Sequence, residues 1–483
     1  MQITAGHSHP IDMPHHTSPG LPGLPAERAG DAAGGAGLLA CHECDLLLRD
    51  PLPHYSPDAL PAHAARAAEV CCPRCGARIY RVARASVNQT LAIALSACIV
   101  FLIANAFPIA SITAQGRQND STLLGAVHLL WQEDMIPIAL LVLFTTVIVP
   151  ALELLVFVSV LMFLRSGRPL HRLRTLPPVL RAVLHARPWS MIEVFMLGVL
   201  VALVKLGHVA SLSAGIALWA YAALMVLMAA LSSTISMRNL WAALPLRRPA
   251  AAPVAGRPAT GETASACGWV SCHACGLLSP QAAHAGDCPR CATPLHQRTP
   301  GSLRAALALL LAASILFFPA NLLPIMETGS LFGAQSDTIM SGVAYLWHSG
   351  SWPLAALVFV ASIVVPLFKL LMLGGLLLSV QLGWHRHRRA RTRLYRVLEA
   401  VGRWSMLDIY VVTILSALVQ IGSVATINVG PGAIAFGGVV VLTMLATLRF
   451  DPRLIWDASP GGGTATAAAP PAHTDPKEAL NHG

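Results

Sequence analysis

The sequence predicts an all-α polytopic membrane protein with eight transmembrane helices, arranged as two parallel four-helix repeats. Three observations lead to this prediction: low charge, long apolar runs, and motifs that recur in the same order along the chain. Of the 483 residues, 55% are hydrophobic and only 12% are charged, which is about half the charged share of an average soluble domain. This composition excludes a soluble enzyme, a disordered protein and a coiled coil.

The two ends of the chain are predicted to be disordered tails. Residues 1–37 are rich in Gly, Pro, Ala and His and contain no apolar core of a signal peptide. Residues 457–483 are dominated by Gly, Ala, Pro and polar residues, a composition that buries too little apolar surface to fold. Between the repeats, residues 242–266 are rich in Ala, Pro and Arg and are predicted to form a linker.

Eight of the 11 cysteines form four Cys-x-x-Cys pairs, two ahead of each predicted repeat. Two such pairs can bring four thiolates into the tetrahedron that a structural zinc site requires. We therefore predict two zinc ions, one in a small cytoplasmic ribbon at residues 38–84 and one in a ribbon at residues 267–300. Disulfides, a thioredoxin-like redox pair and rubredoxin-type iron are the alternatives. The predicted ligands are Cys41, Cys44, Cys72, Cys75, Cys272, Cys275, Cys288 and Cys291.

Apolar runs long enough to cross a membrane occur four times in each half of the chain. Each run predicts one transmembrane helix, so the first repeat covers residues 85–241 and the second covers residues 301–456. The predicted spans are residues 88–111, 136–164, 190–212 and 214–236 in the first repeat, and residues 305–326, 353–380, 405–427 and 431–449 in the second.

Arginine is concentrated in one loop of each repeat, which predicts the orientation in the membrane. Residues 165–188 contain six Arg and no acidic residue, and residues 381–403 contain seven Arg and a single acid, Glu399. Because loops rich in basic residues stay in the cytoplasm, both termini and both ribbons are predicted to face it. This reducing compartment favours metal over disulfides. The net charge of +10 is therefore expected to set the topology, and no nucleic acid partner is expected.

The two repeats align at a nearly constant spacing along the chain. Cys72-Pro-Arg-Cys75 recurs as Cys288-Pro-Arg-Cys291, and Trp189-Ser-Met recurs as Trp404-Ser-Met. Because each repeat has four predicted spans, both copies have the same orientation, and the pseudo-twofold axis is expected to lie along the membrane normal.

The second helix of each repeat carries a proline followed by an ionisable residue. Pro150-x-x-Glu153 in the first repeat corresponds to Pro366-x-x-Lys369 in the second. Each proline removes a helical hydrogen bond, and each ionisable side chain lies one turn further on, too deep to reach water. Ionisable groups at such depth are candidates for function. The alternative is a static pair between Glu153 and Lys369 across the two repeats.

Five further polar residues are candidates for a polar network inside the membrane. Glu193 and Asp408 lie near the start of the third helix of each repeat, and Lys205 lies deeper in the first of these helices. Asn105 and Asn321 each belong to an Asn-x-x-Pro motif that ends the first helix of a repeat. These amides either satisfy backbone groups freed by the proline or line a cavity at a broken helix end.

The paired cysteine ribbons, the Asn-x-x-Pro and Pro-x-x-Glu/Lys motifs and the Trp-Ser-Met openings together resemble the paraquat-inducible protein A family over about residues 38–457. The resemblance implies a multi-pass protein of the bacterial inner membrane that is not an enzyme. It also implies a partner, a periplasmic mammalian-cell-entry (MCE) domain protein that forms a tunnel. The implied role is to load or extract phospholipid at the base of that tunnel and so to support outer-membrane integrity.

Two other functions remain open from the residues alone. One is a membrane redox protein or sensor that uses the Cys-x-x-Cys pairs, and the other is a small-solute secondary transporter without a tunnel partner. The sequence contains no nucleotide-binding P-loop, so any driving force for transport must come from elsewhere.

Overall fold

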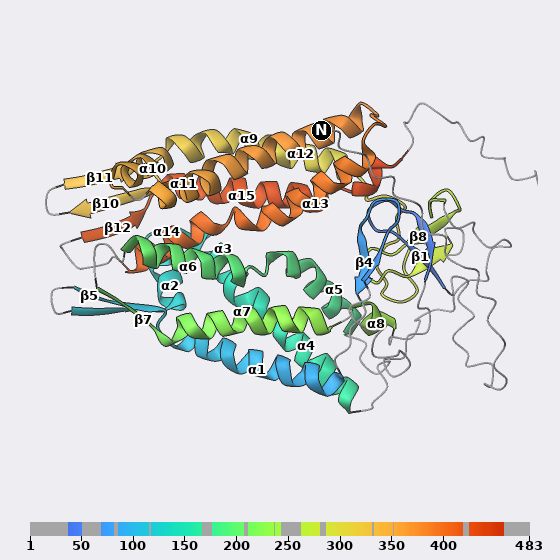
Figure 1. The fold of residues 1–483 in the computed structure, drawn as a ribbon, viewed down its shortest axis with the longest axis horizontal. Helices are drawn as coiled ribbons and strands as arrows, with labels where there is room; N and C mark the ends of the chain where they lie inside the picture. Colours follow the sequence, from blue (N-terminus) through green and yellow to red (C-terminus); the bar gives the residue numbers. More distant parts are fainter. Residues whose placement is uncertain are drawn as a thin grey trace, which may run out of the picture.

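The computed structural model shows two helical halves with strands at one end and cysteine-rich modules at the other (Figure 1). In Figure 1 the first half, blue to green, lies below the second half, yellow to red. Apart from Gly37 and Asp457, both predicted tails lie outside the described residues, as does most of the predicted linker. The structure describes residues 37–50, 69–81, 86–114, 117–166, 176–206, 211–235, 237–242, 262–280, 286–330, 333–350, 352–418 and 425–457.

The same order of elements occurs in both halves. The first half contains α1 (Val87–Ala106), α2 (Leu123–Gln132), α3 (Ile136–Leu143), the π-helical turn η1 (Phe144–Ile148), α4 (Val149–Arg165), α5 (Leu176–Ala186), the 3-10 turn η3 (Arg187–Trp189), α6 (Ile192–Leu206), α7 (Ile216–Thr234) and α8 (Met237–Ala242). The second half contains α9 (Ser302–Leu322), α10 (Ile339–His348), α11 (Trp352–Phe359), the π-helical turn η5 (Val360–Val364), α12 (Val365–Gln381), α13 (Arg388–Trp404), α14 (Leu407–Leu418), α15 (Pro431–Arg449) and the 3-10 turn η6 (Pro452–Ile455).

Seven helical stretches of the described chain are long and apolar enough to cross a membrane, and each overlaps a predicted span. Their outward side chains include Leu102, Ile315 and Phe318, each at least 68% exposed, as expected of surfaces that face lipid. The prediction of a membrane protein is therefore confirmed. At the eighth predicted span, residues 405–427, the described helix is α14 with 12 residues, and residues 419–424 lie outside the described chain. The seven stretches are Val87–Ala106, Ile136–Arg165, Leu176–Val204, Ile216–Thr234, Ser302–Leu322, Ala355–Gln381 and Pro431–Arg449.

The expectation of a purely helical membrane part is wrong at one end, where each half forms a three-stranded antiparallel sheet. The predicted spans that end at residues 111, 212, 326 and 427 therefore extend too far. Pro108 and Pro324 are the reason for the first and third, because the residue before a proline is disfavoured in helix, and Phe107 and Leu323 are extended. The strands are β5 (Ala110–Ala114), β6 (Arg117–Ser121) and β7 (Ser211–Ala214), in the order β6-β5-β7, and β10 (Met326–Ser330), β11 (Gly333–Asp337) and β12 (Ala425–Val429), in the order β11-β10-β12.

A π-helical turn precedes each of the two intramembrane prolines. η1 ends just before Val149-Pro150, and η5 ends just before Val365-Pro366. The wider turn accommodates a proline ring, which would otherwise clash with the carbonyl four residues earlier. Thr146 and Ser362, at those earlier positions, each donate a 2.6 Å side-chain hydrogen bond to a carbonyl of their own helix. The predicted disruption of the helix at both prolines is thus a local widening rather than a break.

The two halves meet where α6 packs against α14. Gly198 of α6 lies directly against Tyr410 of α14. The Tyr410 ring also stacks edge-on against Phe195 at a centroid distance of 5.5 Å, and its hydroxyl donates to Thr145 Oγ1 in η1 at 2.9 Å. This buried contact joins the π-helical turn of the first half to the second half.

Substituting Gly198 with Ala is expected to destabilise the contact between the halves. A methyl carbon at this position would lie 2.8 Å from Tyr410 Cβ, well inside van der Waals contact, and such overpacking costs about 1–3 kcal/mol. The measurement is thermal unfolding of the purified protein in detergent. Gly375→Ala is the matched control, because nothing lies within 4 Å of the corresponding position in α12. Equal melting temperatures for the two variants would contradict the close approach of α6 and α14.

Candidate functional site

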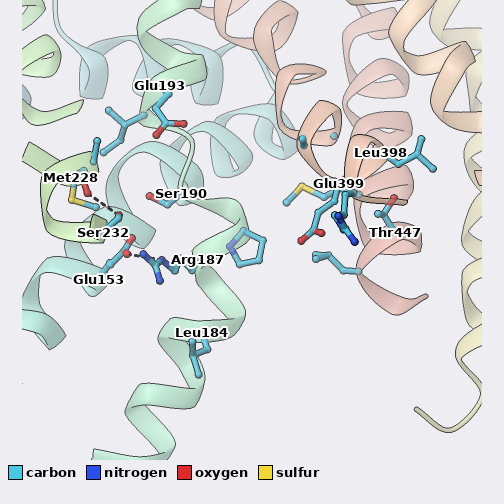
Figure 2. Close-up of a pocket in the computed structure, with 18 of the residues that line it drawn as sticks. Glu153, Leu184, Arg187, Ser190, Glu193, Met228, Ser232, Leu398, Glu399 and Thr447 are labelled. Carbon is cyan, nitrogen blue, oxygen red and sulfur yellow. Dashed lines mark hydrogen bonds and ion pairs between the residues drawn. The ribbon is translucent and has the colours of Figure 1, made fainter. Parts of the chain in front are cut away.

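A cavity of about 590 Å³ lies between the two halves. One wall comes from α4, the α5–η3 segment, α6 and α7 of the first half, and the other comes from α13 and α15 of the second half (Figure 2). Both polar and apolar side chains line it. The apolar lining includes Leu184, Ile192, Met225, Met228, Leu398, Met444 and Leu448.

The first-half wall is built around an ion pair between Glu153 and Arg187. Glu153 is buried on α4, and its Oε1 lies 3.3 Å from Arg187 Nε. Arg187 begins the short 3-10 turn η3, so Pro188 and the turn direct the chain from α5 into α6. Ser190 and Ser232 line the same wall (Figure 2), and together these groups provide charge and hydroxyls beside the methionines.

The second-half wall carries Arg396 and Glu399 on α13 and Thr447 on α15. In Figure 2, Glu399 and Thr447 lie across the cavity from Glu153 and Arg187. Arg396 reaches out of the wall, because its Nε lies 2.9 Å from Glu43 Oε2 near the chain's amino-terminal side. A cavity lined by charged groups, hydroxyls and flexible apolar side chains can hold a molecule that has both a polar and an apolar part.

The alternative for Glu153 and Lys369, a static pair between the two side chains, is not what the structure shows. Lys369 is buried on α12 and donates from Nζ to Thr443 Oγ1 of α15 at 2.8 Å, whereas Glu153 pairs with Arg187 of its own half. The reason is that each proline-containing helix packs within its own half, α4 against α1 and α12 against α9 and α15. Lys369 is still linked to the cavity wall, because Thr447 donates to the carbonyl of Thr443 at 2.9 Å.

The remaining candidates of the predicted polar network are separated. Glu193 lines the cavity. Asn105 and Asn321 lie at the ends of α1 and α9, and each donates from Nδ2 at 2.8 Å to the carbonyl one turn earlier in its own helix, which is not the carbonyl that the following proline frees. The side chains of Lys205 and Asp408 lie outside the described part of the structure.

Sequence reasoning missed several groups that the fold brings to the cavity. Arg187 and Arg396 lie in the two arginine-rich segments, whose charge by itself predicts only the orientation in the membrane. Their neighbours Pro188 and Glu399 were the available hints, because a proline turn and a lone acid interrupt otherwise basic stretches. No sequence signal marks Ser190, Ser232 and Thr447, which line the cavity, or Thr443 behind its wall, since hydroxyls in apolar helices commonly bond to their own backbone.

A smaller cavity of about 90 Å³ lies between the halves near the strand end. Ile138 and Val201 of the first half line it together with mostly apolar residues of the second half, and Ser362 of η5 is among its few polar groups. The contact between the halves therefore contains cavities toward both of its ends.

The eight predicted metal ligands gather into two buried clusters, which confirms that part of the prediction. In each cluster the four sulfur atoms lie within 4.8 Å of one another. The close sulfur–sulfur distances are 3.5–3.6 Å, near the roughly 3.8 Å edge of a tetrahedron with metal–sulfur bonds of about 2.3 Å. Four thiolates in this arrangement fit a tetrahedral metal ion.

Each cluster belongs to a small module of hairpins. The first cysteine module (residues 37–50 and 69–81) contains β1 (Leu38–Ala40), β2 (Leu47–Arg49), β3 (Glu69–Cys71) and β4 (Arg78–Arg81). The second cysteine module (residues 262–280 and 286–298) contains β8 (Trp269–Ser271) and β9 (Leu278–Pro280).

A residue with a left-handed backbone follows every cysteine pair in both modules. Gly76 and Gly276 have φ of +73° and +70°, a conformation that glycine adopts without strain. Asp45 and Ala292 occupy the equivalent positions with φ of 62° and 56°. The turn lets backbone N–H groups approach the sulfurs, as Ala77 does at 3.4 Å from Cys75 Sγ.

The chain is similar to one family model and to several known proteins, which are named for intermembrane transport or for an envelope-spanning tunnel. Residues 87–245 and 303–459 match the family model for paraquat-inducible protein A. The chain is 34% identical over 426 residues to the intermembrane transport protein PqiA of Escherichia coli strain K12, covering 87% of this chain and 96% of that protein. It is 31% identical over 422 residues to the lipophilic envelope-spanning tunnel protein A of the same strain, covering 87% and 92%. A probable intermembrane transport protein of Haemophilus influenzae is 29% identical over 425 residues, covering 87% and 95%. No solved structure matches.

Proposed function

Since this chain belongs to the paraquat-inducible protein A family, we propose that it loads or extracts phospholipid at the base of a periplasmic tunnel formed by an MCE-domain protein. In this role it is a component of the inner membrane that supports outer-membrane integrity. The names of its relatives, intermembrane transport protein and lipophilic envelope-spanning tunnel protein, support a lipid-like cargo moved between membranes.

The observation that carries the proposal is the amphipathic cavity between the halves. Arg187 lines the cavity and is 34% exposed, so its guanidinium group is suited to a phosphate. Met225, Met228 and Met444 offer a flexible apolar surface suited to the start of an acyl chain. Because the cavity lies between two halves rather than inside one, a small movement of the halves could admit and release a lipid.

The organisation that we propose follows from the recurring element order. The eight spans form two parallel repeats, at residues 85–241 and 301–456, with the linker at residues 242–266. Each cysteine module is a zinc ribbon that holds one ion and faces the cytoplasm, as do both termini. Supporting observations are the two tetrahedral sulfur clusters and the arginines of α13, which lie at the end of the helical body that carries the modules (Figure 1).

In this proposal the polar network positions the headgroup and responds to it. Glu153 and Glu193 act at the first-half wall, and Lys369 acts through Thr443 behind the second-half wall. Asn105 and Asn321 stabilise the helix ends at which the strands begin. We retain Lys205 and Asp408 as members of the network on the strength of their positions in the third helices.

A tryptophan in the cavity is expected to block lipid binding. Ser232 lines the cavity, whereas its neighbour Ser233 does not and is also exposed. Ser232→Trp should lower photocrosslinking of a diazirine-bearing phospholipid roughly tenfold, the equivalent of about 1.4 kcal/mol of binding free energy, and Ser233→Trp should leave it unchanged. Mass spectrometry of crosslinked peptides gives the readout, with outer-membrane barrier function measured in cells. Equal crosslinking of both variants would contradict a lipid site in this cavity.

A further inference from the structure

The first cysteine module precedes the first half in sequence, but much of its docking surface is on the second half. Arg396 of α13 donates from Nε to Glu43 at 2.9 Å and from Nη2 to the carbonyl oxygen of Cys75 at 2.6 Å. Trp456, which follows the last helix of the second half, packs against the apolar cluster around the module's four cysteines. Glu43 lies between two of the metal ligands, so a folded metal site holds the carboxylate in place for Arg396.

The second cysteine module precedes the second half in sequence, but much of its docking surface is on the first half. Arg181 of α5 donates to the carbonyl oxygen of Ala292, next to the ligand Cys291, at 3.3 Å. The four cysteines also share a buried apolar cluster with residues of α4, α5 and α8. These residues are Val156, Val160, Leu176, Leu180, Val183, Leu240 and Trp241.

The two modules also bind to each other and form one unit. The Leu47 N–H donates to the carbonyl of Glu262, and the Ala264 N–H donates to the carbonyl of Asp45, both at 2.8 Å. Arg298 Nη1 lies 3.0 Å from Asp45 Oδ2. Two further ion pairs tie this unit to the ends of both halves, Asp50 with Arg238 and Asp457 with Arg298.

The first module also contacts Arg238 of α8, through Tyr80 and Asp50. Tyr80 donates from its hydroxyl to Asp50 at 2.6 Å, and its ring lies under the Arg238 guanidinium. Burial and this hydrogen bond raise the pKa of Tyr80 to about 12. The phenol is therefore protonated and keeps donating throughout the physiological range.

Each module thus contacts a wall of the cavity that belongs to the other half. The first module contacts the second-half wall, and the second module contacts the helix that leads into the first-half wall. Glu43 holds Arg396 in the second-half wall, and Arg181 belongs to the helix that continues into Arg187 in the first-half wall. We propose that the two metal-loaded modules form an exchanged clamp, which sets the separation of the cavity walls at this end. Metal occupancy then regulates access to the cavity, and this consequence rests on the proposed function because the cavity is the proposed phospholipid site.

Amide hydrogen exchange on the full-length protein tests the crosswise docking. Cys72→Ser disables the metal site of the first module. It should speed amide exchange in α13 roughly tenfold and leave exchange in α5 nearly unchanged. Disabling the second module with Cys288→Ser should do the reverse. Each variant should keep one of the two metal ions by elemental analysis. If each module instead loosens its own following half, or if neither variant changes either helix, the exchanged clamp is wrong.

A second pair of variants tests the docking while both metal sites are intact. Glu43→Gln removes the carboxylate that holds Arg396, and it should speed exchange over residues 388–404 with metal content unchanged. Glu69→Gln is the matched control, because its pair with Arg78 is on the exposed side of the same module. The same exchange rate for α13 in both variants would overturn the role of Glu43.

Phospholipid photocrosslinking separates this inference from the proposed function. Crosswise exchange rates without lipid crosslinks in the cavity would leave the clamp standing and refute the lipid site. Lipid crosslinks that are unaffected by Glu43→Gln, together with unchanged exchange in α13, would refute the clamp and leave the lipid site standing.

Discussion

Removing metal from the purified full-length protein with a strong chelator is expected to unfold both cysteine modules and leave the membrane helices folded. Four thiolates cannot stay buried side by side without an ion, and structural zinc sites contribute apparent binding free energies of about 10–16 kcal/mol. The eight ligand cysteines are buried and should become reactive to an alkylating reagent only after chelation. Intact-mass spectrometry counts the modified cysteines, and elemental analysis of the native protein should give two zinc ions per chain.

The other cysteines provide the internal control for this experiment. Cys71 is exposed, and Cys98 and Cys267 are partly exposed, so their modification should not depend on metal. Cys288→Ser should lose one of the two ions, and Cys98→Ser should lose neither. Iron in place of zinc would refute the metal assignment, and alkylation of all cysteines in the native protein would refute the metal sites themselves.

Lys369→Met is expected to raise thermal stability and to abolish the proposed lipid transport. Lys369 is buried, and Thr443 is its one hydrogen-bond partner among the described residues. Lys369→Met keeps a similar side-chain volume and removes the desolvation cost of a buried ammonium group that a hydroxyl, not a carboxylate, accompanies. Without the Lys369 amine, the Thr443 hydroxyl behind the second-half wall loses its hydrogen-bond donor. Thermal unfolding in detergent and outer-membrane barrier function in a strain lacking its own homologue give the two readouts.

Glu153→Gln is expected to lower thermal stability. In a double variant this loss should add to the gain from Lys369→Met. The amide leaves Arg187 without its carboxylate, but Arg187 is 34% exposed, so solvent limits the cost to about 1–2 kcal/mol. Sites with separate partners add within about 0.5 kcal/mol. A double variant that regains both abundance and transport would show that Glu153 and Lys369 are coupled directly after all. Thr443→Val is the matched variant, and it should lower transport without the stability gain of Lys369→Met.

The sequence predicted the cysteine clusters, most of the membrane helices and the distortions at the two prolines, because residues close together in the chain determine each of these features. A Cys-x-x-Cys turn brings two sulfurs together by itself, so the four such turns in this sequence predicted two metal sites. A run of about 20 apolar residues has few alternatives to a membrane helix, and seven predicted spans are present. Pro150 and Pro366 disturb the helix wherever it packs, so both distortions were predictable, although their form as π-helical turns was not.

The short strands at one end had no comparable signal. Residues 112–114 and 117–119 are mostly polar or small, and β7, from a distant part of the chain, supplies the third strand of their sheet. Backbone groups near a membrane must find partners, and the tertiary fold provides them here.

The sequence by itself determined that the chain is a membrane protein, where most spans lie, and which cysteines gather. Only the tertiary structure decided that Glu153 pairs with Arg187, that Lys369 binds Thr443, and that each cysteine module also contacts the half it does not precede. The physical reason is range. Turn geometry, proline sterics and apolar runs act within a few residues, whereas the partner of a buried charge or the docking face of a module depends on how helices far apart in the chain pack together.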